Sequence, residues 1–533
     1  MLGFFFVLLL VLAALRPFAV PDEGRYGEIG RWMWISGDWL TPRLNGVPFF
    51  HKPPLLYWLE ALSVGLLGVS EWSLRLIPAL HAGLMLLTLY AAVRHWADAA
   101  LARRSVIMLG SSLGFLVGGQ YVNHDMMVAT WISVAIGCFA MAFLAGERAH
   151  RGWALAGFAA CGLGMLSKGL IGFVLPGLVL AVWLSWTRQW RKAWSLPWLS
   201  GLALFAAIAL PWFVAAQARY PGFFDYMFIG QQFHRYTAQG YNNPQPWWFY
   251  ALALVLLLFP WVFFAGRAMR HVTDTTLARA LRPSAAVWSL CWIWVGAITV
   301  FFSIPNSKLV GYILPVLPPL CVLAALGWER SLGARPSGAR WFAGLVALNL
   351  AIALALVLTV GKVTRASRTQ DVAAVLACAA RPHDTIWVAD GFPYDLPLYA
   401  QTTRPLRVVA DWSALRQSAG DGWQRELFEG ADFDAQAAQV LQPVAALAQA
   451  AHQPGQWYLG RKGAPIPGQA ADAASPWRLA YRGFGWDLYQ SQPEGHADSA
   501  PKGPETAEHI GLPGCKDQRH SQREPARPAQ ATQ

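Results

Sequence analysis

The chain has 533 residues, of which 55% are hydrophobic and 14% are charged. A soluble globular protein carries about 25% charged residues, so this composition argues against a soluble class and favours a membrane protein. The net charge of +12 does not indicate nucleic-acid binding, because Lys and Arg stand in short groups between apolar runs rather than in one basic patch.

Apolar runs long enough to cross the hydrocarbon core of a bilayer recur along most of the chain. The first run lacks the basic n-region and the clear cleavage site of a signal peptide, so we interpret it as a retained span. The pattern predicts about eleven transmembrane helices, at residues 2–20, 61–93, 105–122, 126–145, 153–167, 169–186, 197–216, 248–266, 285–303, 309–327 and 341–361.

The charges between these runs predict the orientation. Cytoplasmic loops are rich in Lys and Arg, and the basic loops are those at residues 94–104, 148–151, 188–192, 267–282 and 330–340. The opposite loops therefore face outward, together with everything after residue 361. The first of them, residues 21–60, is rich in Pro, Trp and Tyr and predicts short helices lying in the membrane interface.

Beyond the last apolar run the sequence changes character. TQDVAAVLACAARP and AQAAQVLQPVAALAQAA are helix-like, whereas TIWVAD, LRVVADW, QWYLGRK and WDLYQSQ are strand-like. We predict three parts: a transmembrane domain over residues 1–361, an outer α/β domain over 362–491 and a disordered tail over 492–533. The fold class is thus a mainly α polytopic membrane protein with a C-terminal soluble α/β domain.

Ionisable residues at the edges of membrane spans are costly and mark candidate functional sites. By the topology above they all lie on the outer side, although cations otherwise favour the inside. They are Asp22, Glu23, Arg25, His51, Lys52, His124, Asp125, Lys168, His234, Arg235 and Lys308.

This combination of acids and cations suits group transfer at a phosphate. The carboxylates of Asp22, Glu23 and Asp125 would orient or deprotonate an acceptor, while the cations would stabilise a leaving phosphate. The alternative for any single cation is snorkelling of a helix-end side chain. For Asp125 the alternative is capping of the helix that it precedes.

The string PDEGRYGEIGRWMWISGDWLTPRLNGVPFFHKPPLLYWLEA resembles the aminoarabinose transferase branch of the membrane-embedded C-type glycosyltransferases (GT-C), which are related to the protein O-mannosyltransferases. NHDMM, LSKGLIGFVLP, QQFHRYT followed by PWWFY, and PNSKLVGYILPVLPPL agree in the same order. The resemblance covers roughly residues 15–330.

The resemblance implies transfer of a sugar from undecaprenyl phosphate to an acceptor, usually a lipid A phosphate, at the periplasmic face of the inner membrane. It makes Asp22 the signature acid and Asp125 the second acid, with Lys52 and Arg235 on the donor phosphate. We expect Arg25, Lys168 and Lys308 to assist there.

Two positions depart from the family pattern. The aminoarabinose transferases usually have Glu where His51 stands and His where Gln232 stands, and both are implicated in binding a divalent metal. His51 and His234 could re-form a zinc or magnesium site, or serve only as hydrogen-bonding groups. The departure leaves the sugar open between aminoarabinose, glucosamine, galactosamine and a neutral hexose.

Two other functions compete with transfer to lipid A or another envelope glycan. Transfer to a protein hydroxyl would need a strong base and a peptide groove. A lipid-linked sugar transporter would place its polar groups near the membrane midplane in broken helices and repeated halves. The sequence shows no convincing repeat, and its polar groups lie at span boundaries.

Overall fold

The computed structural model describes residues 1–234, 243–269, 285–333, 335–364, 367–469 and 475–492. The chain forms two compact units. The first comprises residues 1–16, 51–56 and 75–359, and the second comprises residues 17–50, 57–74 and 360–533. This division does not follow a single boundary at residue 361, because the first outer loop joins the C-terminal part.

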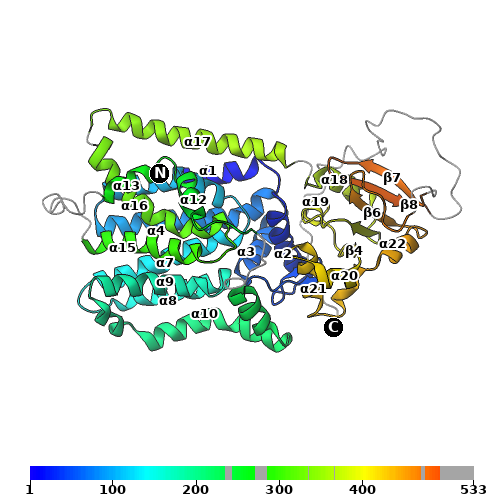
Figure 1. The fold of residues 1–533 in the computed structure, drawn as a ribbon, viewed down its shortest axis with the longest axis horizontal. Helices are drawn as coiled ribbons and strands as arrows, with labels where there is room; N and C mark the ends of the chain where they lie inside the picture. The colour runs from blue at the N-terminus through cyan, green and yellow to red at the C-terminus, as the bar shows by residue number, and fades with distance from the viewer. Residues whose placement is uncertain (235–242, 270–284, 334, 365–366, 470–474, 493–533) are drawn as a thin grey trace. The chain divides into compact units, whose positions relative to one another are not determined.

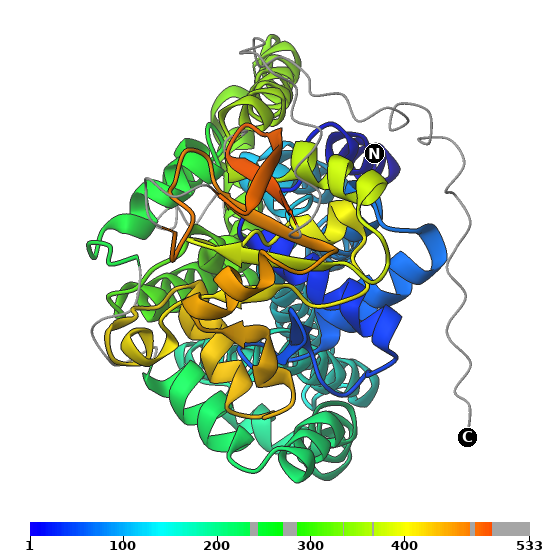
Figure 2. The same cartoon turned by 90° about the vertical axis from the view of Figure 1, so that its right-hand side faces the viewer.

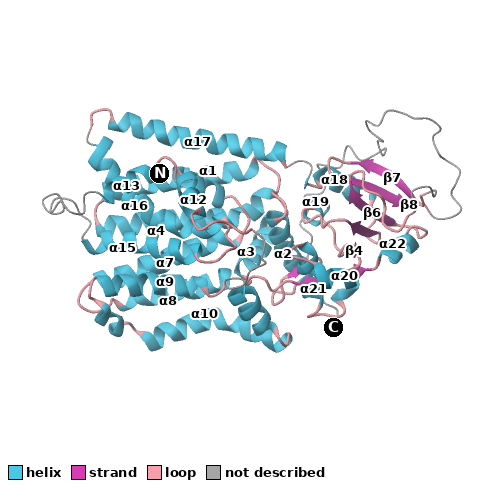
Figure 3. Cartoon of the chain, in the orientation of Figure 1, coloured by secondary structure: helices cyan, strands magenta, loops and turns pink. Residues whose placement is uncertain are grey.

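The first unit is a helical bundle (Figures 1 and 3). Its helices are α1 (Leu2–Ala14), α4 (Glu71–Trp96), α5 (Ala99–Ser111), α6 (Leu113–Gly118), α7 (His124–Leu144), α8 (Arg151–Lys168), α9 (Ile171–Trp186), α10 (Trp198–Arg219), α12 (Phe249–Leu257), α13 (Val262–Met269), α15 (Ala285–Ser303), α16 (Leu317–Trp328) and α17 (Gly338–Val363). Shorter helical segments are η1 (Trp190–Ser195), the π-helix η2 (Asp225–His234), η3 (Val310–Val316) and η4 (Glu329–Gly333).

Six described helical segments are long and apolar enough to cross a membrane, or seven if the pair α12 and α13, bent by 109°, counts as one span. The expected number was eleven. The difference arises where predicted runs are short or broken: α1 has 13 residues, which is about 20 Å of helix. The run 105–122 divides at Ser112, whose hydroxyl accepts a hydrogen bond from Phe115 N and starts α6.

Close helix contacts in the bundle depend on small residues. α8 packs against α7, α9 and α10, which run alongside it in Figure 1. A Cβ added to Gly172 of α9 would lie 2.1 Å from the carbonyl carbon of Gly164 in α8. These two helices therefore approach at backbone distance, as small residues allow in membrane bundles.

The second unit combines a six-stranded sheet with helices on both faces (Figures 2 and 3). Its strands are β3 (Thr385–Ala389), β4 (Arg407–Val409), β5 (Leu441–Gln442), β6 (Gln456–Arg461), β7 (Trp477–Arg482) and β8 (Trp486–Ser491). The spatial order is β5-β4-β3-β6-β8-β7, with β5, β4, β3 and β6 parallel and β8 and β7 antiparallel.

The remaining elements of this unit come from both ends of the chain. The first outer loop supplies α2 (Asp22–Ser36), the hairpin of β1 (Arg43–Leu44) and β2 (Val47–Pro48), and α3 (Leu55–Leu67), whose first two residues belong to the first unit. The C-terminal part supplies α18 (Gln370–Ala379), α19 (Leu396–Ala400), α20 (Trp412–Ser418), α21 (Trp423–Ala431), η6 (Ala437–Val440) and α22 (Val444–Ala450).

Alternation along β3 separates two cores, as the period of a strand requires. Val388 packs into a core with Leu376 of α18 and with Ile29 and Val47 from the first outer loop. Trp387 faces the other side, where it packs with Leu447 of α22. The first loop is thus part of the hydrophobic core of the α/β domain.

Most predicted elements of the C-terminal domain are confirmed, and one is wrong. The helix-like run 435–451 instead forms η6, β5 and α22. The break is at Pro443, which cannot donate a helical hydrogen bond. β7 was not predicted. The disordered tail was predicted over residues 492–533, and residues 493–533 lie outside the described part of the chain.

Candidate functional site

Asp125 and Lys168 form a salt bridge at the start of α7 and the end of α8 in the first unit. The cap of α7 is Asn123, whose side-chain oxygen accepts a hydrogen bond from Asp125 N at 2.9 Å. Asp125 is therefore not the helix cap, and its carboxylate is available to pair with Lys168. Both side chains are about nine-tenths buried, with 11% and 10% exposed.

Two residues of η3, Gly311 and Tyr312, lie beside this salt bridge. The ammonium of Lys168 lies 4.1 Å from the ring centroid of Tyr312, a cation–π distance. The backbone of Gly311 passes so close to Asp125 that an added Cβ would lie 2.0 Å from its Oδ2. An alanine there would push the carboxylate aside, so the position of Asp125 depends on the absence of a side chain at Gly311.

A cavity of about 270 Å³ opens beside this pair. Its lining mixes two cations with amides and a broad apolar surface. The lining residues are His51, Lys52, Pro53, Lys168, Leu170, Ile171, Val174, Met227, Gln231, Gln232, Phe233, Phe301, Phe302, Pro305, Ser307 and Tyr312. The cavity can therefore hold an anionic group next to an apolar chain.

Gln232 closes one side of the cavity. Its side-chain oxygen accepts a hydrogen bond from Leu170 N at 2.7 Å, and its amide nitrogen donates to Met227 O at 3.4 Å. The side chain thus ties η2 to the turn that follows Lys168. At a position where the family pattern has His, the amide serves as a connection between two backbone segments.

The two histidines of the predicted metal site, His51 and His234, differ in their exposure. His51 is buried, and its ring lies edge-on to Tyr226 with centroids 5.9 Å apart. His234 is exposed at the end of η2. Among the described residues, no three His, Cys, Asp or Glu side chains gather closely enough to hold a metal ion. A metal site at His51 and His234 therefore stays a prediction.

Lys308 has a different environment from the other predicted cations. Its ammonium donates to Gln245 O at 2.9 Å and to Pro305 O at 2.5 Å, and burial lowers its pKa. Lys308 therefore holds two loop segments together, and its role on the donor phosphate stays a prediction. Arg235 lies outside the described residues.

Asp22 and Arg25 belong to the second unit, at the start of α2. The guanidinium of Arg25 pairs with Asp22 and also with Glu426 of α21. Tyr394 donates its hydroxyl to Glu426 at 2.6 Å. Burial on its own would lower the pKa of Arg25, but Glu426, Tyr26, Tyr394 and Asp22 outweigh it and raise that pKa.

Glu23 and Glu60 are fully buried carboxyl groups near this cluster. Glu23 accepts a hydrogen bond from Ala19 N at 2.7 Å and so stabilises the turn before α2; its catalytic role stays a prediction. Burial, and secondarily the charge of Glu23, raises the pKa of Glu60 well above the usual value.

Sequence reasoning missed Glu426, Tyr394 and the pair Gly311 and Tyr312. Glu426 lies 401 residues from its partner Arg25, in a helix with no motif. Gly311 and Tyr312 stand inside the string PNSKLVGYILP, where a glycine next to an aromatic residue is the available signal.

Three kinds of comparison bear on this arrangement. The family model described as dolichyl-phosphate-mannose-protein mannosyltransferase matches residues 4–227. A Pseudomonas aeruginosa (strain UCBPP-PA14) protein named undecaprenyl phosphate-alpha-4-amino-4-deoxy-L-arabinose arabinosyl transferase is 32% identical over 339 residues, which are 62% of this chain and 60% of the relative. A Sodalis glossinidius protein, numbered 1 under the same name, is 33% identical over 62% of this chain and 58% of its own length.

The crystal structure of ArnT from Cupriavidus metallidurans bound to undecaprenyl phosphate superposes with a TM-score of 0.78 and 27% identity, covering 91% of this chain and 96% of that one. The chain resembles the aminoarabinose transferases in both sequence and fold. This likeness confirms the polytopic membrane fold class. The sequence alignments, however, span only about 60% of the length of the curated relatives.

Proposed function

We propose that the protein is a membrane glycosyltransferase that moves aminoarabinose or another aminosugar from an undecaprenyl-phosphate donor to a lipid A phosphate or another envelope glycan. The names of the relatives and the undecaprenyl phosphate bound to the Cupriavidus structure support the donor class. The observation that carries the proposal is the cavity that combines Lys52 and Lys168 with an apolar wall.

The cavity suits the two ends of such a donor. The phosphate would lie against Lys52 and Lys168, as anions do against ammonium groups. The first prenyl units would lie along the apolar side chains Ile171, Val174 and Phe302. A phosphodiester carries one negative charge, and the departing undecaprenyl phosphate gains a second. Cations beside it therefore stabilise charge that develops during transfer.

In the proposed reaction, the bond between the sugar C1 and the donor phosphate oxygen breaks, and an acceptor oxygen bonds to the same carbon. Undecaprenyl phosphate leaves with the electron pair. A lipid A phosphate is already ionised near pH 7 and needs no strong base. We therefore assign Asp125 to orienting Lys168, and Asp22 either to orienting the acceptor or to stabilising charge on the sugar ring.

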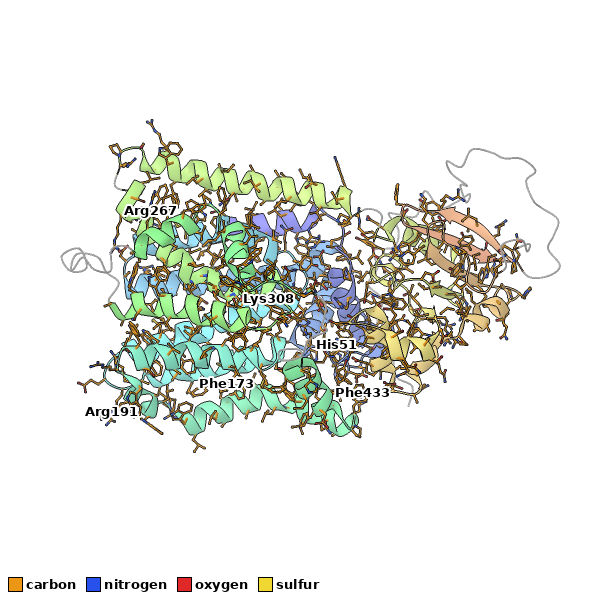
Figure 4. The ribbon with its side chains drawn as sticks, in the orientation of Figure 1. His51, Phe173, Arg191, Arg267, Lys308 and Phe433 are labelled. Carbon is orange, nitrogen blue, oxygen red and sulfur yellow. The ribbon has the colours of Figure 1, made fainter. Side chains whose placement is uncertain are left out.

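We place the site at the periplasmic face of the inner membrane. Figure 4 supports a polarity within the first unit: Arg191 and Arg267, from two basic loops, lie at one end, and His51 lies toward the other. Basic loops mark the cytoplasmic side. The cavity that His51 lines then opens on the outer half.

The match of residues 4–227 to the mannosyltransferase model favours one alternative, transfer to a protein hydroxyl. That reaction would require a base for the hydroxyl proton. Mass spectrometry of lipid A and of periplasmic proteins, from cells with and without the gene, separates the two. Modified proteins with unmodified lipid A would establish the alternative.

The direct test uses the full chain in liposomes, with undecaprenyl phosphate-linked aminoarabinose or hexosamine as donor and lipid A as acceptor. We expect a donor-dependent mass increase of lipid A, lost at least about 100-fold in Lys168→Gln and partly restored in Lys168→Arg. The matched control is Lys362→Gln, at an exposed lysine near the end of α17. Wild-type protein that transfers neither sugar, or a fully active Lys168→Gln, would overturn the proposal.

A further inference from the structure

The second unit contains a groove of about 870 Å³ that plays no part in the site above. It lies where β3 and β4 begin, at Thr385 and Arg407, and is bordered by the end of α2 at Trp32 and Ser36. Every residue that lines it belongs to this one unit.

The groove is lined by four arginines and three aspartates. The three aspartates already form ion pairs or accept hydrogen bonds within the protein. Asp434 and Asp38 both pair with Arg43, at 2.9 and 3.6 Å. Asp384 accepts hydrogen bonds from Trp457 Nε1 at 2.8 Å and from Arg381 N at 3.0 Å. The acidic side chains thus have their donors within the protein.

The other three arginines are not engaged in this way. Within the described part of the chain, Arg381, Arg404 and Arg407 make no ion pair with a carboxylate; Arg404 contacts His383, and Arg407 donates to Gln439 O. Arg381 and Arg404 are exposed. Planar guanidinium groups with free donors bind phosphate in a bidentate manner.

The rest of the lining suits a sugar. Thr402, Thr403, Gln401 and Gln436 supply hydroxyl and amide groups, and Trp32 supplies an aromatic side chain. Hydroxyl and amide groups can exchange hydrogen bonds with sugar hydroxyls in both directions. The composition as a whole fits a phosphorylated saccharide better than a bare phosphate ion.

An exposed apolar patch adjoins the groove and suits the apolar part of a lipid. Ile35 and Trp39 are 41% and 37% exposed, and the groove residues Ser36 and Asp38 stand between them in the chain. Trp58 Nε1 donates to Trp39 O at 2.7 Å, which joins this segment to α3.

α3 extends the patch. Its side chains Leu62, Leu66 and Leu67 are exposed, Leu66 by 81%. Apolar and Trp side chains in such a position are typical of contact with the membrane interface. A ligand that spans the groove and the patch has an anionic sugar headgroup and acyl chains.

We propose that this groove docks the phosphorylated saccharide headgroup of the lipid acceptor, with Arg381 and Arg404 on a phosphate and the acyl chains beside α3. This rests on the proposed function and deepens it, because it assigns the acceptor a site separate from the donor cavity. The partner class is a phosphorylated glycolipid.

The test uses full-length protein in nanodiscs of zwitterionic lipid. The groove variant is Arg381→Gln with Arg404→Gln, and the matched control is Arg478→Gln with Arg482→Gln, two exposed arginines of β7 that do not line the groove. The probes are bisphosphorylated lipid A, its dephosphorylated form, inorganic phosphate and phosphatidylglycerol. The readouts are direct binding of each probe and the kcat and KM of transfer.

We expect the groove variant to bind bisphosphorylated lipid A at least about tenfold more weakly and to raise the acceptor KM with little change in kcat, while the control variant behaves as wild type. Dephosphorylated lipid A should bind poorly to wild type. Equal binding of both lipid A forms, equal affinity for phosphatidylglycerol or inorganic phosphate, or an unchanged groove variant would overturn the inference. If the double variant is unstable, Arg404→Gln alone serves.

The two proposals fail in different ways. Wild-type protein that modifies lipid A while the groove variant matches it leaves the proposed function intact and refutes the groove. Wild-type protein that transfers no sugar refutes the function, whatever the binding data show.

Discussion

The two acid–cation clusters of this protein use the same side-chain chemistry to different ends. In the first unit, one carboxylate, Asp125, meets one ammonium, Lys168, at the wall of a cavity. In the second unit, one guanidinium, Arg25, lies between two carboxylates, Asp22 and Glu426, with Tyr394 completing the group.

The two clusters differ in whether the cation can bind a further anion. Lys168 retains an ammonium group next to open space and an aromatic ring, so it can bind an incoming anion. Arg25 has 14% of its side chain exposed, and it already pairs with two acids. Arg25 thus joins the first outer loop to α21 of the C-terminal domain, and its role on the donor phosphate stays a prediction.

The largest effect should follow from removing one acid from the second cluster. Glu426→Gln leaves the largely desolvated Arg25, 14% exposed, with one carboxylate and weakens the hydrogen bond from Tyr394, which should lower the free energy of unfolding by about 3–5 kcal/mol. Thermal unfolding of the full chain, followed by tryptophan fluorescence, measures this.

Glu429→Gln on the same helix is the control, because the side chain of its ion-pair partner Arg425 is 38% exposed. Its cost should stay below about 1 kcal/mol. Equal stability losses in the two variants would show that the buried cluster has no special structural role.

A smaller effect, on activity, should come from crowding the first cluster. Gly311→Ala places a Cβ on the Asp125 carboxylate and should displace it from Lys168. We expect sugar transfer to fall about 100-fold, which corresponds to roughly 3 kcal/mol of transition-state stabilisation. Gly296→Ala in α15 is the control, because nothing lies within 4 Å of its added Cβ. A fully active Gly311→Ala variant would mean that the pair does not contribute to transfer.

The smallest effect is a pH dependence confined to the second unit. Asp395 is fully buried, and burial raises its pKa from 3.8 to about 6, although hydrogen bonds from Thr369 oppose the rise. Between about pH 4 and 6 the folded state therefore binds more protons than the unfolded state, so this contribution to stability is present at low pH and is lost as pH rises to 6.

Asp395→Asn should remove this slope, which amounts to on the order of 2–3 kcal/mol between pH 4 and 7. Unfolding of wild type and variant across that range, compared at each pH, measures the difference. A constant difference between the two proteins would contradict the assigned titration.

Local patterns predicted much of the fold. Strand alternation located β3, β4, β6 and β8, and helical periodicity located α18, because each signal lies within one short segment. Fewer described helices than the eleven predicted spans are long enough to cross a membrane, because local breaks at Ser112 and around α12 and α13 interrupt runs that composition alone joins. Pro443 marks the break within residues 435–451, but the helix prediction for that run followed the apolar periodicity of its neighbours.

The candidate site was likewise predictable only in part. Lys52, Lys168 and His51 were predicted from their places at span ends, and they line one cavity. The state of Arg25 was not predictable, since it depends on Glu426, which only the tertiary fold brings near. The groove at Arg404 was equally hidden, because its walls come from four separate stretches of sequence.

The shared core of the first outer loop and the α/β domain has a consequence for biosynthesis. Residues 17–74 leave the ribosome long before α18 begins at Gln370. At 5–20 residues per second, the loop waits roughly 15–60 s for its partner. During that interval Glu28, Arg31 and the apolar face of α2 have no C-terminal residues to cover them, although the finished protein buries them. A chain that terminates before α18 would therefore leave α2 without the C-terminal part of the hydrophobic core that covers it.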